Sequence, residues 1–124
     1  MSDPKRLILC IDDDPDMLSV LQIVLEAEGY RFASAATAEE GLRVCKAIGP
    51  DLIIVDLMME EIDAGTSFVK DVKLLGIKAP VFLLSSMGDN LNATMDYGAL
   101  GFAGVFQKPV VKQQLLGVIK NKLS

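Results

Sequence analysis

Acidic residues directly follow two short apolar runs, and their type suits metal binding and phosphoryl chemistry. Leu7–Ile11 leads into Asp12–Asp14, and Leu52–Val55 leads into Asp56. A short apolar run bounded by polar residues is typical of a strand buried on both faces of a parallel sheet. Because ligands of such sheets bind beyond the carboxyl ends of the strands, these carboxylates are candidate site residues. Taken alone, an Asp in this place is as often only the start of a turn.

A hydroxyl and an amine follow two further predicted strands: Ser85 comes after Ala79–Leu84, and Lys108 after Phe102–Phe106. Clustered carboxylates repel one another and need a hard cation, and Mg²⁺ prefers oxygen ligands. A carboxylate nucleophile, Mg²⁺, a hydroxyl and a lysine together suit the formation of an aspartyl phosphate, since the metal and the lysine neutralise phosphoryl charge. The combination predicts phosphoryl transfer. Taken alone, Ser85 also fits a strand-end cap, and Lys108 a solvated charge where a strand ends.

The composition narrows the function further. The 124-residue chain has no histidine, which excludes a Ser-His-Asp mechanism and most zinc sites. Its net charge of −5 argues against direct nucleic-acid binding. No apolar run approaches the ~18 residues of a membrane helix, and the N-terminus lacks the apolar region of a signal peptide. Cys10 and Cys45 lack metal-ligand spacing, so we expect buried thiols in a cytoplasmic protein.

Strand and helix patterns alternate along the whole chain. Asp14 is placed to cap a helix with Pro15 at its first position, and Thr37 with Glu40 forms a capping box. The alternation predicts a parallel sheet with right-handed crossovers and helices on both faces. At this length we expect a single domain over residues 1–124, an α/β flavodoxin-like doubly wound (βα)5 fold with strand order 2-1-3-4-5. The predicted strands are Leu7–Ile11, Tyr30–Ala35, Asp51–Val55, Ala79–Leu84 and Phe102–Phe106, and the predicted helices are Pro15–Gly29, Thr37–Gly49, Phe68–Gly76, Asp89–Leu100 and Val111–Leu123.

Four motifs, in this order and spacing, resemble those of the receiver domain of two-component response regulators, of the chemotaxis-regulator type. They are Ile11–Pro15, Val55–Met59, Pro80–Ser85 and Lys108–Pro109. The resemblance covers essentially the full length of the chain. It implies a signalling switch that catalyses only its own phosphorylation and dephosphorylation.

The resemblance also implies the site. Asp56 would be the phosphoacceptor and a metal ligand, and Asp13 a direct Mg²⁺ ligand. Asp12 would act largely through metal-bound water, and the backbone carbonyl of Met58 would complete the protein ligands.

The remaining implied features concern the phosphoryl group and its effect. Ser85 and Lys108 stand where the family has its phosphate-contacting hydroxyl and lysine. The donor would be a phosphohistidine on a sensor histidine kinase or a histidine phosphotransfer protein. Phosphorylation would shift the face formed by helix four, strand five and helix five, and so control a partner protein or a fused output domain.

One departure from the family concerns the usual aromatic residue three positions before the lysine, where this chain has Val105. Phe106 follows it. Because side chains alternate along a strand, Phe106 is predicted to face the opposite way and to belong to the core.

Three alternative functions fit parts of the sequence. A haloacid-dehalogenase-like phosphatase would use Asp12 in the pattern Asp12-x-Asp14, but Asp14 is better used as a helix cap and the chain is too short for a substrate cap. In an FMN carrier, three aspartates after the first strand would repel the phosphate. A folded but unphosphorylated receiver remains open. No output domain follows the last predicted helix, so we expect a stand-alone regulator or part of a longer protein.

Overall fold

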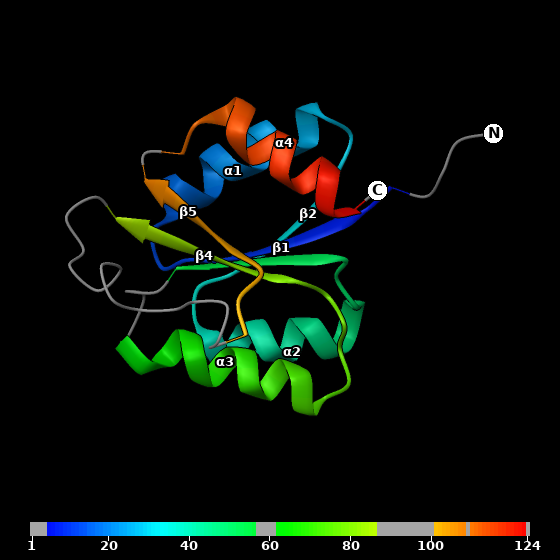
Figure 1. Ribbon diagram of the computed structural model, residues 1–124, viewed down its shortest axis with the longest axis vertical. Helices are drawn as coiled ribbons and strands as arrows, with labels where there is room; N and C mark the ends of the chain where they lie inside the picture. Colours follow the sequence, from blue (N-terminus) through cyan, green and yellow to red (C-terminus); the bar gives the residue numbers. More distant parts are fainter. Residues whose placement is uncertain (1–4, 57–61, 87–100, 109, 124) are drawn as a thin grey trace.

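A computed structural model describes residues 5–56, 62–86, 101–108 and 110–123. Five parallel strands form one sheet in the order β2-β1-β3-β4-β5. Helices α2 and α3 lie on one face of the sheet, and α1 and α4 on the other (Figure 1). This confirms the predicted doubly wound α/β fold and its strand order. The elements are β1 (Leu7–Ile11), α1 (Pro15–Ala27), β2 (Arg31–Ala35), α2 (Ala38–Ile48), β3 (Leu52–Asp56), α3 (Ile62–Leu74), β4 (Val81–Ser86), β5 (Gly104–Lys108) and α4 (Lys112–Leu123).

The central strands are buried on both sides, and their alternating residues supply two separate cores. Leu9 and Ile11 of β1 pack in the core beneath α2 and α3. Ile8 and Cys10 pack in the core shared with α1 and α4. A strand with no exposed face needs a continuous apolar sequence, which explains why β1 and β3 read as unbroken apolar runs. No helix in the described part of the chain is both long and apolar enough to cross a bilayer.

Two side-chain caps start helices where the sequence predicts them. The Asp14 carboxylate accepts a hydrogen bond from the backbone N–H of Asp16 (3.0 Å) at the start of α1. The Thr37 hydroxyl accepts one from the backbone N–H of Glu40 (3.1 Å) at the start of α2. The Glu40 carboxylate, however, accepts from the N–H of Ala36 (2.8 Å), one residue before the cap. All three bonds satisfy backbone N–H groups that the helices and their entries would otherwise leave to water.

Replacing the Thr37 cap should measurably destabilise the fold. We expect Thr37→Ala to lower the free energy of unfolding by about 1 kcal/mol, because the first turn of α2 loses its hydroxyl acceptor. Urea denaturation measures this change. Ser19→Ala, at an exposed position inside α1, is the matched control and should cost less. Equal losses in the two variants would show that the cap contributes nothing specific.

The structure corrects several predicted boundaries. Strand β5 runs from Gly104 to Lys108, two residues later than predicted, and Phe102 is a buried core residue just before it. Lys108 therefore ends the strand instead of following it, and Asp56 is likewise the last residue of β3. Helix α3 begins at Ile62, earlier than its apolar pattern suggests. The predicted helix Asp89–Leu100 lies outside the described residues.

Candidate functional site

The pairing of β1 with β3 brings the predicted acidic residues together. Ile11, the last residue of β1, pairs with Val55, so Asp12 just after β1 and Asp56 at the end of β3 fall at the same edge of the sheet. Carboxylate oxygens of Asp12, Asp13 and Asp56 all lie within 4.8 Å of one another. The three carboxylates named from the sequence thus form one cluster at the carboxyl ends of adjacent strands.

The three carboxylates differ in exposure. Asp12 is fully buried and Asp56 is 6% exposed, whereas Asp13 is exposed to solvent. The backbone N–H of Asp12 donates to the carbonyl of Ala35 at the end of β2 (3.0 Å), and its Oδ1 accepts from the backbone N–H of Asp14 (3.0 Å). Asp12 is therefore oriented by main-chain groups on both sides. The role of the Ala35 carbonyl has no signal in the sequence, because any residue type supplies it.

The donor set fits a hard cation. At an effective dielectric of about 20, two unit charges at this separation repel by about 3 kcal/mol. A divalent cation removes that repulsion. The cluster offers only carboxylate oxygens, which suit Mg²⁺ better than softer metals. Asp12, Asp13 and Asp56 are the described residues able to hold Mg²⁺, and the Met58 carbonyl proposed beside them lies outside the described residues.

The backbones of Ser85 and Lys108 reach the same edge of the sheet. Asp56 pairs with Leu84, which places Ser85 one residue further along the neighbouring strand. Ser86 pairs with Lys108, so β4 and β5 end together. The side-chain positions of Ser85 and Lys108 lie outside what the structure describes.

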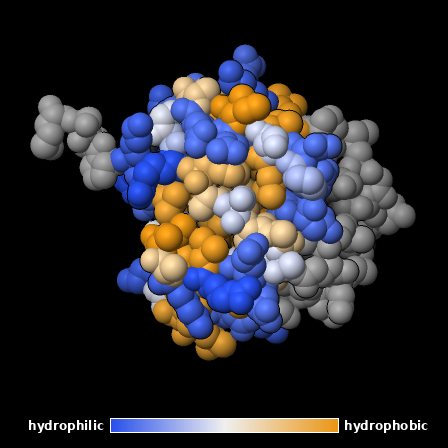
Figure 2. All heavy atoms as spheres, turned by 180° about the vertical axis from the view of Figure 1, so that it is seen from behind, coloured by the Kyte–Doolittle hydropathy of each residue, from blue (hydrophilic) through white to orange (hydrophobic). Residues whose placement is uncertain are grey.

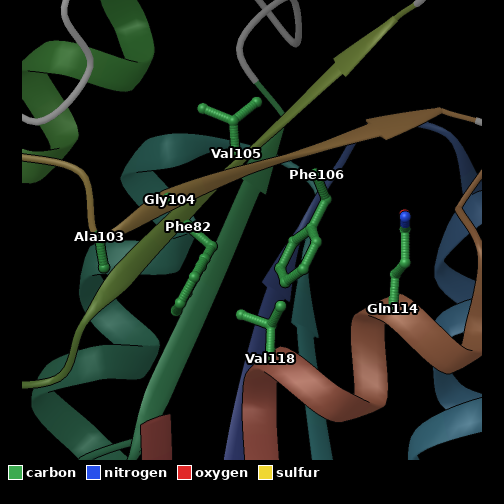
Figure 3. A pocket seen from close by; sticks show the side chains of 7 residues that line it. All are labelled: Phe82, Ala103, Gly104, Val105, Phe106, Gln114 and Val118. Carbon is green, nitrogen blue, oxygen red and sulfur yellow. The ribbon is translucent and has the colours of Figure 1, made fainter. Parts of the chain in front are cut away.

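Val105 and Phe106 point to opposite faces of β5 (Figure 3). Val105 is half-buried and packs against the core beneath α2 and α3. Phe106 is buried in the other core, where its ring stacks on Phe82 with centroids 5.1 Å apart. The prediction that Phe106 belongs to the core is confirmed.

Comparison with known proteins identifies the family. The sequence model of the protein family "response regulator receiver domain" matches residues 8–120 of this chain. The chain belongs to the response regulator receiver family. Receiver domains of response regulators are signalling proteins, and the resemblance inferred from the sequence is confirmed.

Relatives of this receiver are longer proteins. It is 34% identical to the transcriptional regulatory protein GlrR of Escherichia coli over 126 residues, which cover 99% of this chain and 27% of that protein. It is 31% identical to the transcriptional regulatory protein PrrA of Mycobacterium tuberculosis, over 94% of this chain and 49% of that protein. The receiver thus spans between about a quarter and a half of the length of these relatives.

Solved structures agree with this fold. A response regulator receiver domain protein from Clostridium thermocellum is 28% identical with a TM-score of 0.82, over 95% of this chain and 94% of that one. The chemotaxis response regulator CheY4 of Vibrio cholerae is 24% identical with a TM-score of 0.84, over 97% of this chain and 100% of that one. At 24% identity, the likeness to CheY4 shows a shared fold alone.

Proposed function

We propose that this receiver accepts a phosphoryl group on Asp56, in a Mg²⁺-dependent transfer from a phosphohistidine of a sensor histidine kinase or a histidine phosphotransfer protein. The observation that carries the proposal is the cluster of Asp12, Asp13 and Asp56 oxygens within 4.8 Å. A carboxylate beside two others at the open edge of a sheet suits both metal binding and nucleophilic attack. The reducing cytoplasm is the expected compartment for this chemistry.

The transfer is a displacement at phosphorus. A carboxylate oxygen of Asp56 forms a bond to phosphorus, the phosphorus–nitrogen bond of the donor breaks, and its electron pair returns to the imidazole. Mg²⁺, when bound, supplies positive charge to the phosphoryl oxygens. Asp12, Asp13 and Asp56 would hold the ion, together with the backbone carbonyl of Met58. The backbone N–H of Asp14 fixes the Asp12 carboxylate, so its position is set before the donor arrives.

Signal output follows from the charge added at Asp56. Ser85 donates a hydrogen bond to the phosphoryl oxygens and Lys108 neutralises part of their charge. Because these residues lie in β4 and β5, drawing them toward Asp56 shifts the surface formed by β5 and α4. A partner protein or a fused output domain responds to that shift, as a population change between two packings.

Labelling by a small phosphodonor tests the proposed function directly. The full chain is incubated with acetyl phosphate in excess Mg²⁺ or in EDTA, and its intact mass is recorded. We expect the mass of one phosphoryl group to be added in Mg²⁺ only, and peptide mapping to place it on Asp56. Labelling of another residue, or equal labelling in EDTA, would contradict the proposal.

The same samples test the phosphatase alternative. Asp14, which that mechanism needs beside Asp12, has its carboxylate bonded to the Asp16 N–H as a helix cap. We therefore expect no turnover of p-nitrophenyl phosphate. Turnover that is lost in Asp12→Asn and kept in Asp56→Asn would instead favour the phosphatase.

A further inference from the structure

The peptide unit between Ala35 and Ala36 is hydrogen-bonded on both sides, by groups of two different segments. Its carbonyl, on Ala35, accepts from the backbone N–H of Asp12 (3.0 Å). Its N–H, on Ala36, donates to Oε1 of Glu40 in the first turn of α2 (2.8 Å). A trans peptide is planar and directs its C=O and its N–H to opposite sides. One rigid unit therefore connects the Glu40 carboxylate to the backbone of Asp12, a member of the acidic cluster.

Strand β2 lies at the edge of the sheet, where this connection has a physical reason. Ala35 is the last residue of β2 and pairs with Ile11 of the neighbouring β1. The outward N–H groups of an edge strand lack the acceptors that another strand would supply. Since the Ala35 carbonyl is directed toward the β1 side, the Ala36 N–H is directed outward, and Glu40 supplies its acceptor. The end of β2 is thus held from both sides.

The start of α2 is itself packed closely against β1. Gly41 follows Glu40, and a Cβ added to Gly41 would collide with Cδ1 of Ile11, the residue before Asp12. Gly41 and Ile11 are both buried. The missing side chain allows the helix backbone to approach the strand at this point. The Glu40 carboxylate therefore holds the Ala35–Ala36 peptide from a helix whose position relative to β1 is fixed by packing.

Glu40 is exposed, and an acidic residue in the first turn of a helix is favourable for that helix alone. Figure 2 shows hydrophilic side chains spread among apolar ones over one face of the molecule, which is ordinary for a protein surface. Glu39, exposed in the same turn, fits this description. Glu40 differs, because the peptide that its carboxylate binds is bonded in turn to Asp12.

We propose that Glu40 is a positioning residue for the Mg²⁺ site: its carboxylate holds the Ala35–Ala36 peptide, and that peptide holds the backbone of Asp12. Hydrogen bonds in series polarise one another, so a carboxylate on the N–H side makes the Ala35 carbonyl a stronger acceptor. The Asp12 side chain is fixed separately, by the backbone N–H of Asp14 (3.0 Å). Groups that orient a ligand in this way raise its affinity for the metal. The proposal rests on the proposed function in taking Asp12 as part of the metal site.

Calorimetric titration of the full chain with MgCl₂ tests the proposal without a phosphodonor. Glu40→Ala removes the acceptor and should raise the Kd for Mg²⁺ at least about threefold. This is less than the roughly 10–100-fold that follows removal of a group bonded directly to a metal ligand, because one peptide intervenes. Glu40→Gln keeps an uncharged oxygen acceptor, and its Kd should lie within about twofold of that of the unaltered chain.

Two neighbouring variants separate positioning from helix capping and from charge. Thr37→Ala removes the hydroxyl cap of the same helix but neither partner of the Ala35–Ala36 peptide. Glu39→Ala removes one exposed negative charge from the same turn. Both should bind Mg²⁺ within about twofold of the unaltered chain, since solvent and salt screen an exposed charge. Weakening in Thr37→Ala equal to that in Glu40→Ala would make Glu40 a helix cap only, and would overturn the proposal. Glu40→Gln as weak as Glu40→Ala would assign the effect to charge and overturn it as well.

The amide proton of Asp12 gives a second readout that needs no metal. Its chemical shift, measured on the ¹⁵N-labelled full chain in EDTA, reports the strength of its hydrogen bond to the Ala35 carbonyl. We expect an upfield shift in Glu40→Ala, and little change in Glu40→Gln or Thr37→Ala. An Asp12 amide that does not move in Glu40→Ala would show that the two hydrogen bonds are not coupled.

Acetyl phosphate labelling of the same variants separates this proposal from the proposed function. Weaker Mg²⁺ binding by Glu40→Ala, in a chain that takes up no label even when unaltered, would support the positioning role and reject the phosphoacceptor. Labelling at Asp56 together with an unchanged Kd for Mg²⁺ in Glu40→Ala would do the reverse.

Discussion

Asp56→Asn will leave this receiver folded but unable to take up a phosphoryl group. The amide has the size of the carboxylate and keeps one carbonyl oxygen, but it lacks the anionic oxygen that attacks phosphorus. Since Asp56 is only 6% exposed and lies against two other carboxylates, removing its charge does not leave the cluster short of anions. Label from acetyl phosphate should fall below detection by intact-mass measurement, while far-ultraviolet circular dichroism stays unchanged.

Asp71→Asn is the matched control for this variant. Asp71 is exposed on α3, away from the carboxyl ends of the strands, and its replacement by Asn should leave labelling intact. Residual labelling of Asp56→Asn at Asp12 or Asp13 would show that the nucleophile is not unique to β3, and the assignment of the phosphoacceptor would be wrong.

Asp12→Asn should make the fold more stable when divalent cations are removed. Asp12 is fully buried within 4.8 Å of two other carboxylates, and each such pair costs about 3 kcal/mol at an effective dielectric of 20. The amide keeps an oxygen that accepts from the Asp14 N–H, so the local turn is preserved. We expect the free energy of unfolding in EDTA to rise by about 1–3 kcal/mol, the repulsion being partly screened by solvent at Asp13.

Mg²⁺ should narrow or reverse the difference in free energy of unfolding between Asp12→Asn and the unaltered chain, because the cation stabilises the folded form of the unaltered receiver by binding to it. Urea denaturation of both proteins, in EDTA and in excess Mg²⁺, gives the four free energies needed. Asp71→Asn should have the same free energy of unfolding in EDTA as the unaltered chain, and Mg²⁺ should stabilise both proteins equally. If Asp12→Asn were less stable than the unaltered chain in EDTA, interactions that favour the Asp12 charge would outweigh the repulsion.

Much of the fold was predictable because the buried parallel strands have a strong sequence signal. Strand β1 has the predicted bounds, and its apolar run ends where the acidic cluster begins. The caps at Asp14 and Thr37 were also predictable, since their side chains act on backbone groups two or three residues away. These features depend on local chemistry alone.

The features that the sequence did not predict depend on long-range packing. Phe102 suggested an earlier start for β5, because apolar type marks burial but not the hydrogen-bond pairing that defines a strand. Asp56 was expected after its strand, yet it still pairs with Leu84 of β4. A surface hollow of about 390 Å³ between β5 and α4 was not foreseen at all, since it requires Gly104, Phe82 and Val118 of three different elements to meet.

The division into two cores also gives this protein two internal reporters of local opening. Cys10 lies in the core shared with α1 and α4, and Cys45 in the core beneath α2 and α3. Burial raises the pKa of the Cys45 thiol to about 11, and burial together with the Asp12 charge raises that of Cys10 still further. Neither thiol is nucleophilic while its core is closed, because the reactive form is the thiolate. Alkylation of each cysteine therefore reports separately how often one side of the sheet loses its helical cover.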